Sequence, residues 1–253
     1  MNEVVTFDLA SIRRSCVHCS LRQLCLPAGI GAEELQKLDE IVRRRRPVTQ
    51  NERLYRPGDA MAAVYVARDG AFKTVTISEQ GEEQIIGFHL PGELIGLDAL
   101  AEGVHRCEAV ALTTANVCEV PFEQLSEVAM QLPGLQQQLL RIIGQSVGRD
   151  HDHLGMLVRR QAVERIALFL HGLAERYRNI GESATEFRLP MSRDDIARYL
   201  GLALETVSRG FGKLQDDGVI AVVGRRIEIL NSAELDRLAH DAENEEPRRR
   251  GRA

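Results

Sequence analysis

The hydrophobic pattern of this 253-residue chain changes its period once, and that change restricts the folds it can adopt. Between about residues 47 and 122, short β-rich runs such as 63–68, 72–77 and 84–88 are separated by glycine turns. From Pro133 to about Gly172, apolar residues recur at helical spacing instead. Regular short strands indicate a small barrel or a double-sheet roll. The sequence therefore predicts an α+β chain with an N-terminal β-roll and a helical second half.

Two shorter patterns flank the predicted strands. Residues 31–45 carry apolar side chains at helical intervals, which predicts a short amphipathic helix that Pro47 ends. After Pro133, a first apolar stripe of Leu135, Leu139 and Ile142 is expected to pack on the roll. A second helix is expected from Val163 to about Tyr177.

A second stripe on the helix after Pro133 has the spacing of a two-stranded coiled coil. Its members are Leu140, Ile143, Val147, Asp150, Leu154 and Leu157. In a parallel dimer, two Asp150 carboxylates would meet in a partly dry interface, where like charges oppose association. The pattern predicts a homodimer that Asp150 weakens. The alternative is that Asp150 points into solvent at a helix irregularity near Gly148.

Three of the five cysteines, Cys16, Cys19 and Cys25, are clustered near the N-terminus. An odd number of thiols grouped in this way favours a metal or redox site over a disulfide framework. A fourth ligand would have to be Cys107 or Cys118, and spacing alone does not choose between them. Zinc, an iron–sulfur centre and inert buried thiols all remain compatible with this pattern.

Residues 191–230 have the order of a winged helix-turn-helix. A capping-box-like start at Ser192–Asp195 leads into a first helix, and Gly201 permits a tight turn. The second helix is expected to run to about Asp216, although Ala203 offers no capping side chain. A following hairpin with the basic tip 224–226 predicts a wing.

The second helix carries side chains suited to reading bases. Glu205, Ser208 and Arg209 share one helix face. Glu205 can accept a hydrogen bond from the cytosine amine, Arg209 can donate two to guanine, and the Ser208 hydroxyl can bond to more than one base. Thr206 and Lys213 are better placed for phosphates. The alternative is an ordinary Glu205–Arg209 ion pair on a solvated face.

Composition excludes several classes of protein. A formal net charge of −5 argues against nonspecific coating of nucleic acid, and no apolar run is long enough to span a bilayer. We therefore expect a cytoplasmic protein without a membrane partner. We find no catalytic constellation or phosphate-binding glycine loop, so we do not expect an enzyme. An iron–sulfur redox enzyme would need a substrate or cofactor fingerprint that the sequence lacks.

In the order of its parts, the chain resembles the CRP/FNR family of bacterial transcription regulators, specifically the oxygen-sensing FNR branch. The resemblance rests on the cysteine run Cys16-x2-Cys19-x5-Cys25-Leu-Pro and on residues 78–90, 117–123 and 204–209. It implies a β-roll like a cyclic-nucleotide-binding jelly roll. The expected parts are a cysteine-rich segment (1–30), the roll (31–130), a dimerisation helix (131–160), a winged helix-turn-helix (161–240) and a disordered charged tail (241–253).

The resemblance also implies roles for individual residues. Cys118, rather than Cys107, would join the three clustered cysteines in holding an oxygen-labile 4Fe-4S cluster, which promotes dimerisation and DNA binding without oxygen. Asp150 would tune the dimer. Glu205, Ser208 and Arg209 would read a palindrome similar to TTGAT-N4-ATCAA. The turn of Glu79, Gln80 and Gly81 would contact RNA polymerase, as in an activator.

Other inputs to the same fold remain as alternatives: structural zinc, a thiol switch, a cyclic nucleotide or haem. A cyclic-nucleotide pocket of this family needs a glutamate where the chain has Gly96-Leu97-Asp98, and an Arg-Ser or Arg-Thr pair where it has Arg106-Cys107. A haem sensor would leave the clustered cysteines without a role.

Overall fold

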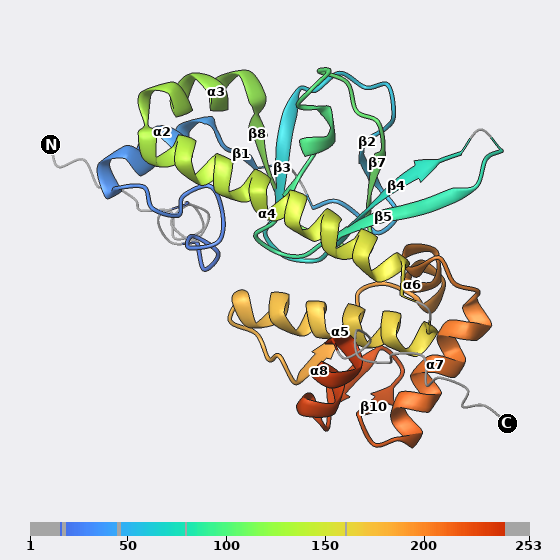
Figure 1. Cartoon of the computed structure of the whole chain (residues 1–253). Coiled ribbons are helices and arrows are strands. Elements are labelled where there is room, and N and C mark those ends of the chain that lie inside the picture. The colour runs from blue at the N-terminus through green and yellow to red at the C-terminus, as the bar shows by residue number, and fades with distance from the viewer. Residues whose placement is uncertain (1–15, 17–18, 45–46, 79, 160, 241–253) are drawn as a thin grey trace, which may run out of the picture. The chain divides into compact units, whose positions relative to one another are not determined.

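The computed structural model describes residue 16 and residues 19–44, 47–78, 80–159 and 161–240 (Figure 1). The chain divides into two compact units, one up to Gly148 and one from Arg149. The division falls inside the long helix α4 (Pro133–Leu157), which therefore contributes residues to both units. Among the described residues, no helix combines the length and the apolar character needed to cross a membrane.

The first unit is built on a β-roll of two antiparallel sheets, which confirms the predicted fold class. One sheet has the order β1 (Arg43–Arg44), β8 (Val117–Pro121), β3 (Ala63–Ala67) and β6 (Leu94–Ile95). The other has the order β2 (Arg53–Tyr55), β7 (Glu108–Ala111), β4 (Phe72–Ile77) and β5 (Glu83–His89). The three predicted runs correspond to β3, β4 and β5 within one residue at each end.

Strand β3 is buried on both faces, and alternate residues serve two different cores. Val64 and Val66 pack in a core shared with the helices and the cysteine-rich segment. Ala63, Tyr65 and Ala67 point into the other core, which fills the roll. Successive side chains of a strand paired with β3 must therefore also point alternately into the outer core and into the core that fills the roll.

Helices cover the outer core of the first unit. They are α2 (Ala32–Ile41), α3 (Phe122–Gln131) and the beginning of α4, while a short 3₁₀ turn, η2 (Leu97–Ala99), follows β6. As predicted, Leu135 and Ile142 of α4 are buried in this core, and Leu139 packs against it. Helix α3 was not predicted, although Leu125 and Ala129 give it a buried face.

The predicted end of the first helix was wrong. Helix α2 ends at Ile41 rather than near Pro47, because the chain is already extended at Val42 and then pairs as β1. Arg43 and Arg44 lie opposite Glu119 and Cys118 of β8. Strand pairing therefore replaces the last helical turn that the apolar spacing suggested.

The second unit has the predicted order of a winged helix-turn-helix. Its helices are α5 (Ala162–Asn179), α6 (Arg193–Leu200), α7 (Leu204–Asp216) and α8 (Ser232–His240). Its antiparallel sheet has the order β10 (Ile220–Val223), β11 (Arg226–Ile229) and β9 (Glu186–Arg188). The capping box is present, with the Asp195 N–H donating to Ser192 Oγ at 3.0 Å. Neither β9 nor α8 was predicted individually.

The turn between β3 and β4 depends on Gly70, whose φ of +69° lies in the left-handed region. A Cβ built there would lie 2.6 Å from Ala115 Cβ and 2.9 Å from the Thr114 carbonyl oxygen. Gly103 has a similar φ of +71° but has no atom within 4 Å of such a Cβ. A side chain at Gly103 would therefore meet backbone strain alone, whereas a side chain at Gly70 would meet both backbone strain and a steric clash.

We expect Gly70→Ala to destabilise the roll more than Gly103→Ala. Both variants should lose about 1–2 kcal/mol from the left-handed backbone, and Gly70→Ala a further ~1–3 kcal/mol from overpacking. Differential scanning calorimetry of the full-length chain measures both, with Gly103→Ala as the matched control. Equal destabilisation of the two variants would contradict the close packing of this turn.

Candidate metal centre and nucleic-acid interface

Four of the five thiols line a single cavity in the first unit. Cys16, Cys19 and Cys25 come from the N-terminal segment, and Cys118 comes from β8. The remaining wall is largely apolar, with two arginines, Arg22 and Arg68, also lining it. Residues that are about a hundred positions apart in the sequence therefore place soft ligand atoms in one partly buried space.

The register of β8 separates the two candidate fourth cysteines. Cys118 lies opposite Val66 of β3, and residues that are directly opposite in an antiparallel pair share one face of the sheet. Cys118 consequently points to the outer core, where Cys16 and Cys25 also pack. Cys107 is only 1% exposed and belongs to the core inside the roll. Burial raises the pKa of the Cys107 thiol to about 12.

Consecutive turns hold the cysteine-rich segment in place. The Cys25 N–H donates to the Leu21 carbonyl oxygen, and the Arg22 N–H donates to that of Cys19. The N–H of Cys16 donates to Asp39 Oδ1 of α2 at 3.0 Å. Buried Leu21 and Leu26 anchor the same segment. These contacts position the thiols through the backbone of the segment.

The donor set fits an iron–sulfur or zinc centre. Burial raises the pKa of the Cys25 thiol, and the neighbouring thiols of Cys118, Cys16 and Cys19 raise it further. Thiolates in such a cavity need a nearby positive charge, and a metal centre provides one. Arg22 and Arg68 add positive charge at the wall. Four sulfur ligands are the set that iron–sulfur clusters and structural zinc both use.

The cysteine-rich segment is joined directly to helix α4. Buried Gln138 donates from Nε2 to the Cys25 carbonyl oxygen at 3.1 Å, and Arg141 donates to Gln138 Oε1 at 3.0 Å. At the start of α4, a Cβ on Gly134 would lie 3.3 Å from the Gly29 carbonyl oxygen. A glycine thus lets the helix approach the segment closely. Sequence reasoning missed Gln138, because a polar residue on a helix gives no sign of its burial.

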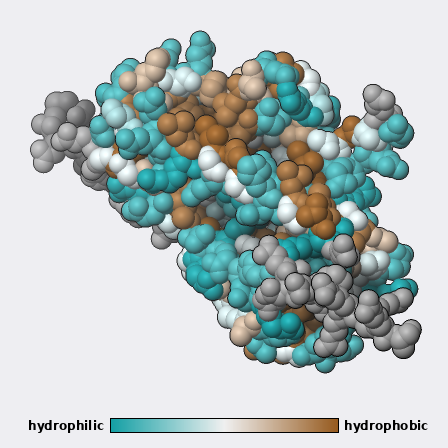
Figure 2. All heavy atoms as spheres, in the orientation of Figure 1, coloured by the Kyte–Doolittle hydropathy of each residue, from teal (hydrophilic) through white to brown (hydrophobic). Residues whose placement is uncertain are grey.

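The other face of α4 leaves apolar side chains exposed. Leu140, Val147 and Leu154 are 64%, 46% and 61% exposed, while Ile143 and Leu157 are half-buried. Figure 2 shows apolar side chains on the face of the molecule along which α4 runs. Asp150 lies in this stripe and is exposed, and the helix continues through Gly148 without a break. The residues of the predicted seam are therefore exposed or half-buried in the single chain.

Helix α7 separates a buried face from a polar exposed face. Val207, Phe211 and Leu214 are buried, whereas Glu205, Ser208 and Arg209 are all exposed. Among the described residues, no ion pair joins Glu205 to Arg209. The three predicted base-reading side chains thus share one solvent-facing surface.

Tight packing fixes α7 against its neighbours. A Cβ on Gly210 would lie 2.3 Å from Ile166 Cδ1 of α5, so a glycine permits the close approach of these helices. The Arg193 guanidinium lies 3.4 Å from the centre of the Phe211 ring, and burial lowers the pKa of Arg193 to about 10. As predicted, Ala203 precedes α7 without a side-chain cap. Packing therefore positions the helix without help from a capping side chain.

The predicted phosphate-contacting residues have partners within the chain or are partly covered. Lys213 Nζ lies 2.8 Å from Asp217 Oδ2, which raises the pKa of the lysine, and Thr206 is half-buried. At the wing, Gly224 has a φ of +61°, Arg225 donates to the Pro190 carbonyl oxygen, and Arg226 pairs with Glu186. A polyanion would have to compete with Asp217 and Glu186 for these cations.

Three side chains of the roll, Asp98, Tyr55 and His105, contact one another. Asp98 Oδ1 accepts from Tyr55 Oη at 3.3 Å and lies 3.2 Å from His105 Nδ1, while Oδ2 accepts from the Arg106 N–H at 2.9 Å. Burial alone would raise the pKa of Asp98, but these hydrogen bonds lower it overall. The Tyr55 and His105 rings stack 3.6 Å apart. The exposed side chain of Arg106 pairs with Glu102.

The β4–β5 hairpin extends beyond the rest of the roll (Figure 1). Its turn contains Gln80, which is exposed, and Gly81, which has a φ of +83°. Glu79, the third residue predicted to contact RNA polymerase, lies outside the described residues. The described part of the turn is therefore accessible to a protein partner.

Comparison with known proteins agrees with this arrangement. Residues 164–238 match the Crp-like helix-turn-helix domain, and residues 45–131 match the cyclic nucleotide-binding domain. The transcriptional activator protein Anr of Pseudomonas protegens is 48% identical over 224 residues, which cover 88% of this chain and 92% of that protein. The chain belongs to the FNR branch of the CRP/FNR family.

Further members of the family support this assignment. The fumarate and nitrate reduction regulatory protein of Escherichia coli K12 is 42% identical over 229 residues, which cover 90% of this chain and 92% of that protein. The structure of FixK2 from Bradyrhizobium japonicum has a TM-score of 0.71 and 31% identity, and covers 78% of this chain and 97% of its own. This FNR-branch chain is thus a DNA-binding transcription regulator.

Proposed function

We propose that this chain is an oxygen-responsive transcription activator controlled by a 4Fe-4S cluster on Cys16, Cys19, Cys25 and Cys118. The observation that carries the proposal is the cavity that these four thiols share, apart from Cys107. Apart from the thiols and two arginines, the wall of this cavity is largely apolar. When bound, the cluster supplies an oxygen-labile link between the cysteine-rich segment and β8.

The residues around the thiols transmit the state of this link to the dimer helix. Cys25 presents its carbonyl oxygen to Gln138, so a shift of the segment changes a buried hydrogen bond on α4. Leu26 and Ile30 share a core with Leu135 and Ile142 of the same helix. A change in this packing biases the position of α4, because a closely packed core favours discrete arrangements over continuous deformation.

Asp150 provides the resistance that makes association conditional. Its carboxylate interrupts an otherwise apolar stripe, so a parallel two-fold dimer brings two negative charges together. Thiols bound to the cluster favour the arrangement of α4 that tolerates the repulsion between the two Asp150 carboxylates. Thiols without the cluster do not favour this arrangement. The dimer then presents two α7 helices to half-sites about one DNA turn apart.

On DNA, we assign base reading to Glu205, Ser208 and Arg209, at a palindrome similar to TTGAT-N4-ATCAA. Their shared exposed face supports this assignment. Thr206 and Lys213 are assigned to phosphates, which implies that Lys213 exchanges Asp217 for the backbone. The turn of Glu79, Gln80 and Gly81 is assigned to RNA polymerase, and the regulator acts in the cytoplasm.

Two alternative inputs differ in their support. A zinc site on the same four thiols has the same donor set and remains the main competing proposal. A cyclic nucleotide is less favoured, because Asp98, Tyr55 and His105 already bind one another inside the roll. Iron and sulfide content distinguishes the cluster from zinc directly.

We expect Cys118→Ser to abolish the iron centre and Cys107→Ser to retain it. The anaerobically purified wild type should be brown and contain about four irons and four sulfides per chain. Cys107→Ser is the matched control, since it removes a thiol from the other core. Colourless wild-type protein with one zinc would contradict the proposal, and loss of iron only in Cys107→Ser would reverse the choice of ligand.

We expect Asp150→Ala to dimerise in air. Removing the carboxylates relieves like-charge repulsion and should tighten dimerisation at least about tenfold, the equivalent of ~1.4 kcal/mol. Sedimentation equilibrium of air-exposed protein measures the change. Asp152→Ala is the control, since residues two apart on a helix point in different directions. An Asp150→Ala variant as monomeric as the wild type would count against the seam.

We expect Arg209→Ala and Lys213→Ala to weaken DNA binding in different ways. Loss of a guanine contact by Arg209 should reduce discrimination at one position of each half-site by about 1–3 kcal/mol. Loss of a phosphate contact by Lys213 should weaken all sequences equally and make the salt dependence less steep. Anisotropy titrations of the anaerobic dimer against base-substituted palindromes separate the two. Uniform weakening by Arg209→Ala would remove it from the reading face.

A further inference from the structure

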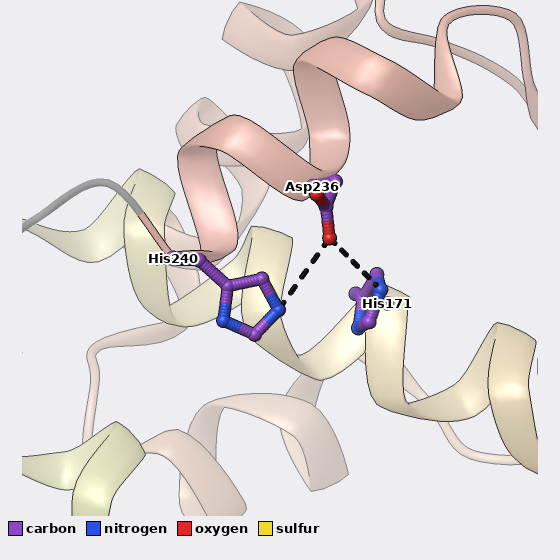
Figure 3. Close-up of side chains that lie close together, drawn as sticks. All are labelled: His171, Asp236 and His240. Atoms are coloured by element: carbon purple, nitrogen blue, oxygen red, sulfur yellow. Dashed lines mark ion pairs between the residues drawn. The ribbon is translucent and has the colours of Figure 1, made fainter.

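Three potential metal ligands meet in the second unit, away from the cysteine-rich segment in the sequence. His171 lies on α5, and Asp236 and His240 lie on α8 (Figure 3). One ligand atom from each residue lies within 4.8 Å of the others. Asp236 and His240 are four residues apart, so one face of α8 presents both toward α5. We propose that these three side chains form a binding site for a divalent transition-metal ion, with Zn²⁺ the best match.

The distances suit ligands of one metal ion better than hydrogen-bonded partners. Asp236 Oδ1 lies 3.3 Å from His171 Nε2 and 3.5 Å from His240 Nε2. Charge-assisted hydrogen bonds between such groups are typically about 2.7–2.9 Å long. Ligand atoms about 2.0–2.1 Å from a tetrahedral zinc ion are separated from one another by roughly 3.3 Å. The distance from the carboxylate oxygen to each imidazole nitrogen is therefore close to the distance between two ligand atoms of a tetrahedral zinc site.

The orientation and exposure of the rings permit an ion to enter. The rings of His171 and His240 are nearly perpendicular, at 88°, with centres 5.1 Å apart, and Asp236 lies between them in Figure 3. The side chain of His171 is 29% exposed, while those of Asp236 and His240 are 60% and 55% exposed. Solvent can thus deliver an ion, and small rotations of the rings can close the site.

The donor set selects the class of ion. Two imidazoles and one carboxylate suit zinc and its first-row neighbours, whereas calcium and magnesium prefer oxygen ligands throughout. Three protein ligands leave at least one position for water or another ligand. This site contains no thiol, so its ion can be distinguished from metal bound to the cysteines.

The site would connect α8 to α5, the helix on which the DNA-reading helix α7 packs. Helix α5 contacts both α7 and α8. Helix α8 has only nine residues, and helices of that length depend on tertiary contacts for stability. An ion that binds only the folded state stabilises it by mass action. Occupancy would thus fix α8 on α5 and make the second unit more resistant to unfolding.

Titration of the full-length reduced protein with Co²⁺ under anaerobic conditions tests the proposal. We expect one component with the ligand-field spectrum of nitrogen and oxygen ligands, separate from the intense charge-transfer absorption that Co²⁺ bound to the cysteine thiolates gives. His240→Ala and Asp236→Asn should weaken this component at least about tenfold. His151→Ala is the matched control, since it removes an exposed histidine from α4.

A second measurement guards against misfolded variants. Excess Zn²⁺ should raise the unfolding temperature of the wild type and of His151→Ala by roughly 5 °C. His240→Ala should unfold like the wild type without metal. Any zinc effect through the cysteines is common to all three proteins, so His240→Ala should gain roughly 5 °C less than the wild type when zinc is added. Cobalt binding with thiolate absorption only, or an equal nitrogen and oxygen component in His240→Ala, would overturn the proposal. So would a variant that loses stability without metal while the wild type ignores zinc, because the three side chains would then form only an ion-pair network.

Discussion

The antiparallel pairing of β3 with β8 is the interaction on which the proposed sensor depends. It sets Cys118 opposite Val66 and so directs this thiol to the outer core. A slip of one residue would turn every side chain of β8 to the other face. Cys118 would then point into the roll, and the cavity would lose the thiol that β8 contributes. Hydrophobic burial on both faces of β3 holds this register.

The same outer core contains both the proposed metal site and the beginning of the proposed dimer helix. The cysteine-rich segment, α2, α3 and the beginning of α4 bury their apolar side chains together. Gln138 adds one directional contact to this non-directional packing, because it donates to the Cys25 carbonyl oxygen. One face of α4 thus packs on the segment, and the stripe containing Asp150 is the face on which we propose that a second chain packs. A weak dimer is useful in this proposal, because a modest change in the packing of α4 on the cysteine-rich segment can then decide whether two chains associate.

Sequence reasoning predicted the parts whose signals are local. Strands β3, β4 and β5, the capping box at Ser192 and the uncapped start of α7 at Ala203 all follow from neighbouring residues. The predicted end of α2 was wrong, because the pairing of β1 with β8, which lies far along the chain, overrode the helical spacing of the apolar residues. The short elements α3, α8 and β9 were also missed, since each is stabilised by the packing of distant segments.

The candidate sites show the same division. The cysteine spacing indicated a metal site, but only a family resemblance chose Cys118, because its side chain direction depends on strand register. The buried role of Gln138 has no local signal at all. At the second unit, the four-residue spacing of Asp236 and His240 was visible, yet His171 lies more than sixty positions earlier. Two residues on a helix did not indicate a site until the fold added the third.

The central claim is that the thiol-bound centre and the dimer are coupled, and one oxygen titration tests it directly. Small additions of oxygen to anaerobic wild-type protein would be followed simultaneously by the visible absorbance of the cluster and by the dimer fraction from light scattering. The account predicts that both signals fall together, and that Asp150→Ala loses its colour while remaining dimeric. A wild-type dimer that persists after the absorbance has gone would contradict the account.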